Sequence, residues 1–500
     1  MSDFLTTSEY QNIAQNLVLP TSSFINGKSY QALSGETFTS TNPATGDALA
    51  NITACQSVDV DYAVASAKNA FASGVWSEIH PNERKGILLA FCDLVEKNKH
   101  EFAVMESLDS GKPICDCESI DIPEFVHTVR WHAELIDKIY DQTAPVGSGA
   151  MSMVVREAVG VVGAVLPWNF PLLMLAWKIA PALAAGCSMV VKPAKQTSLT
   201  AIRIAELASE AGFPAGVLNV ITGGGVAVGE SIGRHMDVDM VTFTGSTITG
   251  RRFLQYSAES NLKKVVLELG GKNPCVVLDD AEDLDYVAEQ VCAAAFWNMG
   301  ENCSAGSRLI VQEGIKDALL ERIKTYSADW RLGDPLNPEN NLGPMIDQGH
   351  FNKVSEYLAL GKEEGYDTVI GGNAIDGRYI EPTIFAGVKN SDRMAKEEIF
   401  GPILSVITVA GFEEAMALEI DTEYGLAASV FTANSKRAIK AARMIKAGTV
   451  TVNCFGEGDI STPFGGYKLS GFGGRDNSIH AHDQYTELKT IWIDLNDHSN

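Results

Sequence analysis

The sequence predicts an α/β protein organised around a parallel sheet, because strand-like runs alternate with helical segments through its middle. These runs and the helices that follow them are, in order, 188–193, 198–211, 217–222, 226–234, 240–245 and 247–258. Such alternation produces parallel strands joined by crossover helices, and dinucleotides bind at the carboxyl ends of strands in sheets of this kind. A second series with the same rhythm runs from residue 267 to near residue 470. We therefore expect two α/β units, the first of them Rossmann-like.

The other elements follow from turn residues and from apolar spacing. Alternating and β-branched residues predict strands, and apolar residues three and four apart predict helices. In chain order we expect strands in 24–30 and 37–52, helices in 59–76, from Pro81 and in 123–140, strands in 152–167 and a last strand in 485–495. Gly111 and Pro113 interrupt the helical pattern before the third of these helices, since both residue types break helices.

Composition narrows the class of protein. The chain has 500 residues, more than one hydrophobic core usually holds, so two or three domains are expected. Hydrophobic residues make up 45% and charged residues 20%, the balance of a soluble globular protein. The 39 basic and 63 acidic residues give a net charge of −24, which argues against nucleic acid and anionic membranes as partners.

Cysteine usage and the start of the chain indicate a reducing cytoplasm. Nine cysteines without regular spacing do not form the disulfide framework of a small secreted protein. Cys115 and Cys117 make a CxC pair, but no second pair or histidine cluster completes a metal site, so no metal is expected. The first residues lack the regions of a signal peptide, and no apolar run approaches the length of a membrane span. We expect a cytoplasmic protein.

One stretch, 298–308, presents a thiol. Cys303 follows a long apolar helical pattern in 285–297 and precedes a strand-like run in 309–312, and small residues such as Gly300 surround it. A cysteine on a glycine-bounded turn at the end of a packed helix is exposed but rigidly held, which suits a nucleophile. The alternative is a structural cysteine, the commoner fate of a single one.

Several separated motifs favour the nucleophile, because together they resemble the aldehyde dehydrogenase family over nearly the whole chain. They are LPWNFP (166–171), VVKPAKQT (190–197), FTGST (243–247), LELGGKNP (267–274), the Cys303 stretch, EEIFGP (397–402) and PFGGYKLSG (463–471). The resemblance implies the family's fold, with an NAD(P)-binding domain from 1–140 and 160–270, a catalytic domain from 271–484, and an oligomerisation arm from 141–159 and 485–500. It also implies a homodimer or homotetramer.

The resemblance implies chemical roles for three residues. Attack of the Cys303 thiolate on an aldehyde creates an oxyanion, which needs hydrogen-bond donors already in place. Asn169, on a turn between two prolines, offers one donor, and the Cys303 backbone N–H offers another. Glu268 ends a strand-like run directly before two glycines, where its carboxylate can activate water to hydrolyse a thioester. The ordinary alternatives are a helix cap for Asn169 and a surface ion pair for Glu268.

The implied cofactor is NAD+, NADP+ or both. FTGS leads into a predicted helix, so backbone N–H groups near Gly245 and Ser246 can bind a phosphate at the helix N-terminus. Glycines 223, 225 and 229 resemble a second phosphate loop, but their spacing is GxGxxxG and no acidic residue follows at the usual distance. By the family match, the cofactor contacts are Pro167, Trp168, Lys192, Lys195, Gly225, Gly229, Phe243, Gly245, Ser246, Leu269, Glu398 and Phe400.

Two positions depart from the family pattern. NAD-preferring relatives often carry a glutamate three residues after the motif lysine, Lys192, and this chain has Lys195 there. A cation does not repel a 2′-phosphate as a carboxylate does, so use of NADP+ is expected beside NAD+. The pair Gly473–Gly474 adds one glycine to the family's usual GxGR ending.

The substrate is expected to be an aldehyde that carries an amino group. The positions that match the family's tunnel wall are Phe170, Trp177, Trp297 and Phe464, and acidic residues in segments of its mouth are Asp121, Glu457 and Asp459. Aromatic faces attract cations, and carboxylates converging on one mouth favour an ammonium or guanidinium group. The ending 456–493 particularly resembles the γ-glutamyl-γ-aminobutyraldehyde dehydrogenases and related ω-aminoaldehyde enzymes of polyamine and putrescine breakdown.

Other functions stay open. The same aromatic residues suit a plain apolar tunnel for aliphatic aldehydes, and guanidinobutyraldehyde and betaine aldehyde are further options. Betaine aldehyde relatives typically carry Tyr in place of Phe170 and Trp in place of Phe464, which counts against that substrate. A CoA-acylating relative usually lacks a base such as Glu268. A non-catalytic relative or a protein that only binds dinucleotide would not need both Cys303 and Glu268.

Overall fold

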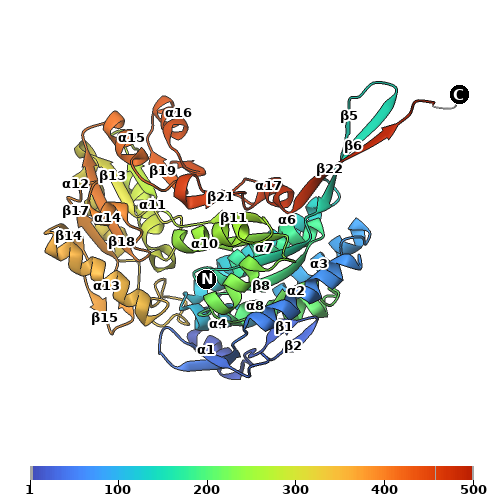
Figure 1. Ribbon diagram of the computed structural model, residues 1–500. Coiled ribbons are helices and arrows are strands. Elements are labelled where there is room, and N and C mark those ends of the chain that lie inside the picture. The colour runs from blue at the N-terminus through green and yellow to red at the C-terminus, as the bar shows by residue number, and fades with distance from the viewer. Residues whose placement is uncertain (1–3, 457, 498–500) are drawn as a thin grey trace.

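The computed structural model describes residues 4–456 and 458–497 and shows two α/β units and an arm (Figure 1). Glu457, expected at the tunnel mouth, lies outside the described residues. The first unit contains an eight-stranded sheet and the second a seven-stranded sheet, each with parallel strands at its centre. The predicted α/β class is confirmed.

The first sheet has the strand order β2-β1-β9-β8-β7-β10-β11-β21. In chain order its strands are β1 (Ser23–Ile25), β2 (Lys28–Tyr30), β7 (Val161–Val165), β8 (Ser188–Lys192), β9 (Leu218–Val220), β10 (Met240–Thr244), β11 (Lys264–Glu268) and β21 (Gly471–Phe472). The strands from β9 to β11 are parallel, and the outer pairings are antiparallel. Parallel strands end at one common edge, so the turns after β7, β8, β10 and β11 meet there.

Helices cover both faces of this sheet, and alternate strand residues point to opposite faces. One core contains Val162 and Ala164 of β7, and the other contains Val161 and Val165. The first of these faces carries α3 (Pro81–Lys97), α4 (Lys99–Ser110), α6 (Ile122–Leu135), α7 (Pro171–Ala185) and α8 (Leu199–Glu210), and the second carries α2 (Ser57–Ala72), α9 (Ser231–Arg234) and α10 (Thr247–Ala258). Burial on both faces explains why these strands are almost entirely apolar.

The second unit has its own core and the strand order β14-β17-β18-β13-β12-β19-β20. Its strands are β12 (Pro274–Val277), β13 (Arg308–Gln312), β14 (Asp367–Ile370), β17 (Thr383–Ala386), β18 (Ile403–Val409), β19 (Ala427–Phe431) and β20 (Thr449–Val452). Its helices are α11 (Leu284–Phe296), α12 (Glu313–Ser327), α13 (Gln348–Glu363), α14 (Arg393–Lys396), α15 (Phe412–Ile420) and α16 (Ser435–Met444).

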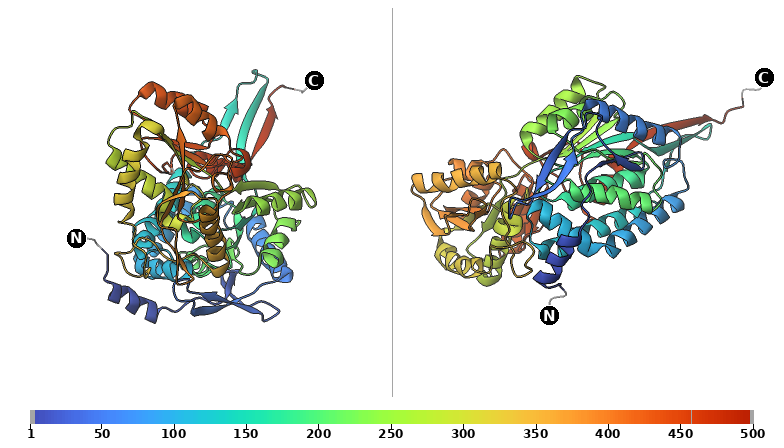
Figure 2. Two further views of the ribbon diagram at one scale, coloured as in Figure 1. Left: turned by 90° about the vertical axis from the view of Figure 1, so that its left-hand side faces the viewer. Right: turned by 90° about the horizontal axis from the view of Figure 1, so that it is seen from below.

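The arm consists of β5 (Gln142–Ala144), β6 (Ala150–Ala158) and β22 (Thr486–Asp494), and it projects from the body in every view (Figures 1 and 2). β22 is antiparallel to β6 in continuous register from Thr486↔Ala158 to Asp494↔Ala150. The predicted pairing of the chain's tail with 141–159 is therefore confirmed. Large apolar side chains of β22, among them Leu488 and Trp492, are exposed.

Short elements complete the chain. They are α1 (Thr7–Asn16), β3 (Thr37–Thr41), β4 (Ala48–Thr53), α5 (Ile114–Asp116), the π-helix η1 (Cys117–Asp121), the π-helix η2 (Gly225–Glu230), η3 (Trp297–Gly300), β15 (Ala374–Ile375), β16 (Tyr379–Ile380), η4 (Lys468–Ser470) and α17 (Ser478–Gln484). The sequence did not predict α1, although Thr6 and Glu9 form a capping box at its start. Among residues 4–456 and 458–497, no helix combines the length and apolarity needed to cross a bilayer.

The structure differs from the predicted elements in three places. The expected helix over 226–234 is η2 followed by α9, and α6 ends at Leu135, where polar residues lead into the arm. The stretch 471–484, assigned to the catalytic domain on sequence, packs with the first unit, because β21 pairs with β11 and α17 contacts α7.

The backbone explains one residue of the Gly473–Gly474 pair, since Gly473 adopts a conformation that requires glycine. Its φ is 84°, and a Cβ there would lie 2.1 Å from the Val265 carbonyl oxygen.

Candidate active site

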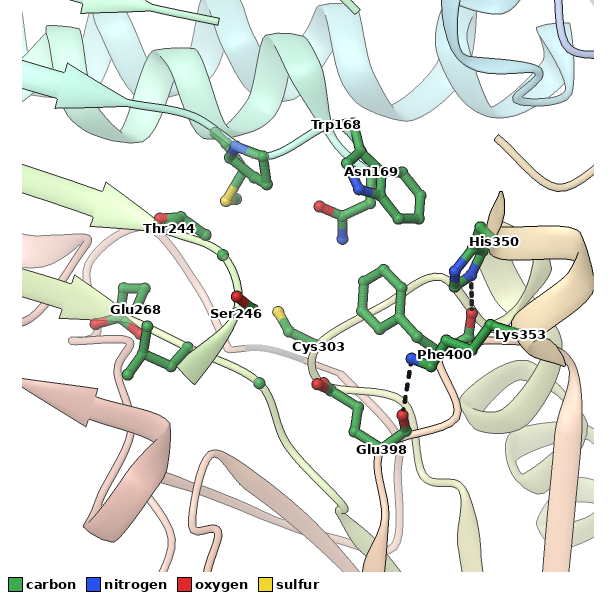
Figure 3. Close-up of a pocket in the computed structure, with 15 residues that line it drawn as sticks. Trp168, Asn169, Thr244, Ser246, Glu268, Cys303, His350, Lys353, Glu398 and Phe400 are labelled. Atoms are coloured by element: carbon green, nitrogen blue, oxygen red, sulfur yellow. Dashed lines mark hydrogen bonds between the residues drawn. The ribbon is translucent and has the colours of Figure 1, made fainter. Parts of the chain in front are cut away.

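A cleft lies at the carboxyl edge of the first sheet, where the second unit closes over it (Figure 3). Its lining residues are Pro167, Trp168, Asn169 and Met174 after β7, Thr244, Gly245 and Ser246 at the end of β10, Glu268, Leu269 and Gly270 at the end of β11, and Cys303, His350, Lys353, Glu398 and Phe400 from the second unit. Asn169 and Cys303 face each other across the cleft, with Glu268 on one side of Cys303 and Glu398 on the other.

The backbone before Cys303 is tightly constrained. α11 ends at Phe296, and Asn298, Met299 and Gly300 then adopt left-handed φ values of 52°, 58° and 67°. A Cβ on Gly300 would lie 2.3 Å from the Gly401 carbonyl oxygen, so glycine is required there. The turn thus delivers the thiol to the cleft at a fixed position.

Asn273, in the motif LELGGKNP (267–274), holds the Cys303 loop through its side chain. The Asn273 amide donates to the backbone oxygens of Cys303 at 2.7 Å and Ala305 at 3.0 Å. Asn273 therefore joins the start of β12 to the residues on both sides of Ser304, and the loop is fixed from two directions.

Asn169 is joined to the cysteine loop by two hydrogen bonds. Its Nδ2 donates to the Glu301 backbone oxygen at 2.9 Å, and Asn298 Nδ2 donates to the Asn169 backbone oxygen at 3.0 Å. A side-chain NH₂ has two hydrogens, so one donor of Asn169 is not used by the Glu301 contact. The side chain is buried at the rim of the cleft and faces Cys303.

Glu268 is buried, and burial raises the pKa of its carboxyl well above the ordinary value. The nearby Asp476 carboxylate raises this pKa further, whereas Lys178 and Arg475 lower it. Lys178 Nζ lies 2.5 Å from Asp476 Oδ2, and both side chains are fully buried. A Cβ on Gly465 would lie 2.6 Å from Glu268 Oε1, so glycine leaves room for the carboxylate.

Seven of the twelve predicted cofactor residues line the cleft, and five do not. The seven are Pro167, Trp168, Gly245, Ser246, Leu269, Glu398 and Phe400, and the five are Lys192, Lys195, Gly225, Gly229 and Phe243. Ser246 Oγ caps α10 by accepting from the Thr249 N–H. Glu398 Oε1 accepts from the Gly271 N–H at 2.9 Å.

The five other residues surround the same sheet edge. Lys192 ends β8, its Nζ donates to the Pro193 oxygen, and burial lowers the pKa of its ammonium to about 8. Gly229 lies beside Lys192, and Gly225 is exposed at the start of η2. Phe243 packs on Phe253 with its ring under Gly245.

Lys195 is exposed, and its Nζ lies 5.3 Å from the centroid of the Phe38 ring. It lines a separate cavity with Gln196 and Asp347. The side chain therefore does not enter the cleft that contains Cys303.

The sequence motifs missed His350 and Lys353, one helical turn apart on α13. His350 Nε2 lies 2.6 Å from the Phe400 backbone oxygen, and burial lowers the pKa of its imidazole to about 4. Lys353 Nζ donates to the Glu398 backbone oxygen at 3.1 Å. Neither residue lies in a recognisable motif or at a strand end, so no sequence signal marks them.

The four aromatic residues predicted for the tunnel gather on the other side of Cys303. Phe170, Trp177 and Phe464 form a buried cluster with Leu173, Met174 and Leu426, and Trp297 and Cys303 pack against it. The Phe170 and Trp297 rings are 5.2 Å apart, and the Trp177 and Phe464 rings are 5.0 Å apart. A second cavity follows this cluster outward and is lined by Trp177, Trp297, Glu124, His127 and Asp459 among others.

The acidic residues at this outer cavity differ from those predicted. Asp459 lies there, with its carboxylate accepting from the Ser461 N–H and hydroxyl. Asp121 does not, because η1 turns its side chain inward, where it is fully buried and accepts from Lys112 Nζ at 2.5 Å. Glu124, which the sequence analysis did not select, is the exposed carboxylate of this segment at the cavity.

Within residues 4–456 and 458–497, no cluster of three or more His, Cys, Asp or Glu side chains is arranged to hold a metal ion.

Comparison with known proteins identifies the family. A profile of the aldehyde dehydrogenase family matches residues 30–491. The aminoacetaldehyde dehydrogenase of Pseudomonas aeruginosa is 61% identical over 99% of this chain and 100% of its own length. The NADP/NAD-dependent aldehyde dehydrogenase PuuC of Escherichia coli is 44% identical over 97% of this chain and 98% of its own length.

A solved structure agrees with these matches. The γ-glutamyl-γ-aminobutyraldehyde dehydrogenase of Burkholderia cenocepacia superposes with a TM-score of 0.96 at 46% identity, covering 98% of this chain and 100% of that one. Profile, sequence and fold agree over almost the whole length, and the chain belongs to the aldehyde dehydrogenase family.

Proposed function

We propose that this aldehyde dehydrogenase oxidises an ω-amino or γ-glutamyl-amino aldehyde to its carboxylic acid, with NAD+ or NADP+ as cofactor. The observation that carries the proposal is the position of Cys303. Its thiol borders the cleft at the strand ends on one side and packs against the aromatic cluster on the other. A nucleophile at this junction can meet a cofactor and an aldehyde that enter from different directions.

Cys303 and Asn169 perform the first step. The thiolate adds to the aldehyde carbon, and the carbonyl oxygen becomes the oxyanion of a thiohemiacetal. The hydrogen of Asn169 Nδ2 that does not bind the Glu301 oxygen is available to this oxyanion. Because Asn169 is buried and tied to the cysteine loop, its donor is in place before the charge develops.

Glu268 completes the reaction as general base. Its deprotonated carboxylate takes a proton from water, which attacks the thioester carbon, releases the acid and regenerates the Cys303 thiolate. Burial next to Asp476 raises the pKa of Glu268 and so strengthens it as a base. The absence of a side chain at Gly465 leaves the room that the Glu268 carboxylate occupies.

The residues of the cleft fit a dinucleotide. The N-terminus of α10 at Gly245 and Ser246 suits a phosphate, and Glu398 suits ribose hydroxyls. The Lys192 ammonium lies at the end of β8, which β7 separates from β10 in the sheet. When bound, NAD+ or NADP+ supplies the two-electron acceptor that turns the thiohemiacetal into a thioester. We include NADP+ because Lys195 lies next to this edge, and a cation does not repel a 2′-phosphate.

The outer cavity supports an amino-substituted substrate. Trp177 and Trp297 offer aromatic faces, and Glu124 and Asp459 add two carboxylates. The relative named for aminoacetaldehyde, and the solved relative named for γ-glutamyl-γ-aminobutyraldehyde, agree with this chemistry. A plain aliphatic aldehyde is the second candidate, favoured by the apolar cluster around Cys303.

An initial-rate panel tests the substrate. We expect kcat/KM for aminoacetaldehyde, 4-aminobutanal and γ-glutamyl-γ-aminobutyraldehyde to exceed that for butanal, guanidinobutyraldehyde and betaine aldehyde, with either cofactor. Butanal turned over as well as 4-aminobutanal would overturn the amino-aldehyde proposal and leave the aliphatic one.

A further inference from the structure

The helix that follows the oxyanion turn has no cap of its own. α7 begins at Pro171, directly after Asn169 and Phe170. Phe170 occupies the N-cap position, and its side chain makes no capping hydrogen bond. Pro171 has no N–H, so the first unsatisfied backbone donor is the Leu172 N–H.

A carboxylate from another helix satisfies this donor. Glu106, on α4, accepts from the Leu172 N–H through Oε1 at 2.9 Å. Its other oxygen, Oε2, accepts from the Thr200 hydroxyl in the first turn of α8 at 2.8 Å. Glu106 is 0% exposed, so both contacts are made inside the protein. One side chain therefore joins the start of α7, three residues after Asn169, to the start of α8.

The same segment supports the turn at a second point. α4 ends at Ser110, and Gly111, with a φ of 79°, follows it as the C-cap. Lys112 comes next and contacts the turn at Phe170. Lys112 Nζ is 4.2 Å from the centroid of the Phe170 ring and is held by Asp121. The Lys112 ammonium thus holds the Phe170 ring, and the Glu106 carboxylate holds the Leu172 backbone N–H.

Burying a carboxylate costs free energy of folding, so stability alone does not explain this side chain. Burial raises the pKa of Glu106 to about 8, which reports how strongly this site disfavours its charge. A poorly fixed Asn169 turn would lower activity, because a displacement of about 1 Å in a reacting group can lower a rate about 100-fold.

We propose that Glu106 is a positioning residue for Asn169, which holds the start of α7 so that the Asn169 amide faces Cys303. The inference rests on the proposed role of Asn169 as oxyanion donor. Glu106 touches neither substrate nor cofactor, and it acts through the Leu172 N–H.

Two substitutions separate the effect of the length of the Glu106 side chain from the effect of its charge. Glu106→Asp keeps the carboxylate but is one methylene shorter, and we expect kcat to fall about tenfold. Glu106→Gln keeps the length and an acceptor oxygen, and we expect kcat within about threefold of wild type. The dissociation constant of NAD+, measured by fluorescence, should change less than about twofold in both. Equal kcat values for Glu106→Asp and wild type would overturn the inference.

A double-mutant cycle shows whether the effect passes through Asn169. Asn169→Ala should lower kcat by about 100-fold or more, as loss of an oxyanion donor does. In the Asn169→Ala background, Glu106→Asp should then lower kcat less than about twofold, because no donor is left to misplace. The same tenfold loss in both backgrounds would overturn the positioning role and leave the proposed reaction intact. No loss on Asn169→Ala would overturn the role of Asn169 and the inference with it.

Two further variants complete the test. Thr200→Val removes only the α8 contact of Glu106, and we expect nearly normal kcat, since the Leu172 contact remains. If Glu106→Asp does not fold, an amide-to-ester replacement at Leu172 removes only the N–H that Glu106 accepts. It should give the same tenfold loss, and wild-type kcat in that protein would contradict the inference.

Discussion

Lys178 Nζ lies 2.5 Å from Asp476 Oδ2, in a fully buried pair beside Glu268. The residues come from α7 and from the turn after β21, so they join parts of the chain 298 residues apart. Their charges act on Glu268 in opposite directions, because Asp476 raises the pKa of the Glu268 carboxyl and Lys178 lowers it. The pair therefore adjusts the base that we propose for thioester hydrolysis.

Asp476→Asn should move the pH dependence of hydrolysis to lower pH. A general base acts when deprotonated, so the rate rises with pH through the pKa of Glu268. Removing the Asp476 charge lowers that pKa, and the rise should begin at lower pH. Stopped-flow measurement of acyl-enzyme breakdown against pH checks this, with exposed Asp279→Asn as control. A rise that stays in place, or moves to higher pH, would contradict the assignment.

Glu124→Gln should weaken recognition of amino aldehydes alone. An exposed carboxylate contributes about 1 kcal/mol or less to an ion pair, so we expect KM for 4-aminobutanal to rise roughly threefold to fivefold. KM for butanal should not change, because it carries no charge. Glu134→Gln, on the same helix but away from the cavity, is the matched control. Equal changes for both aldehydes would remove Glu124 from substrate recognition.

Lys195→Glu should raise KM for NADP+ much more than KM for NAD+. The exposed ammonium can approach a 2′-phosphate, an interaction of about 1 kcal/mol or roughly fivefold in affinity after screening. The wild type should therefore be active with both cofactors. Initial rates with each cofactor measure the effect, and equal changes would show that Lys195 does not face the adenosine ribose.

The arm should assemble the protein into dimers or tetramers. Leu488 is 67% and Trp492 is 62% exposed on β22, which is much apolar surface for a strand that meets only water. Deleting 485–500 should yield monomers or aggregates, but Tyr485 is fully buried and its loss also harms the core. Leu488→Glu with Trp492→Glu is the cleaner change. Light scattering should show a smaller species, and an unchanged mass would refute this role.

Much of the fold is predictable because its central strands are buried on both faces. β8 and β10 are short, apolar and followed by turn residues, so their positions can be read directly. The start of α7 and the residues of α17 are harder to predict, because the segments that they pack against lie far away in the sequence. The return of 471–484 to the first sheet depends on a pairing with β11 that no local pattern announces.

The same distinction holds in the cleft. Asn169, Ser246 and Glu268 lie at or just after the ends of parallel strands, so the topology brings them to one edge and their motifs reveal them. His350 comes from the first turn of α13 in the second unit and has no motif. Asp121 illustrates the opposite error, since its segment approaches the tunnel but a π-helical turn directs its carboxylate to Lys112.

The covalent intermediate on Cys303 is the most direct test of the account. Glu268→Gln should form the thioester and hydrolyse it slowly, since the base is missing while the nucleophile remains. Intact-protein mass spectrometry after mixing this variant with NAD+ and 4-aminobutanal should show the mass increase of one 4-aminobutanoyl group that replaces the thiol hydrogen. Peptide mapping should place it on Cys303, and Cys303→Ala should show none. No acyl adduct, or an adduct on another residue, would contradict the proposed mechanism.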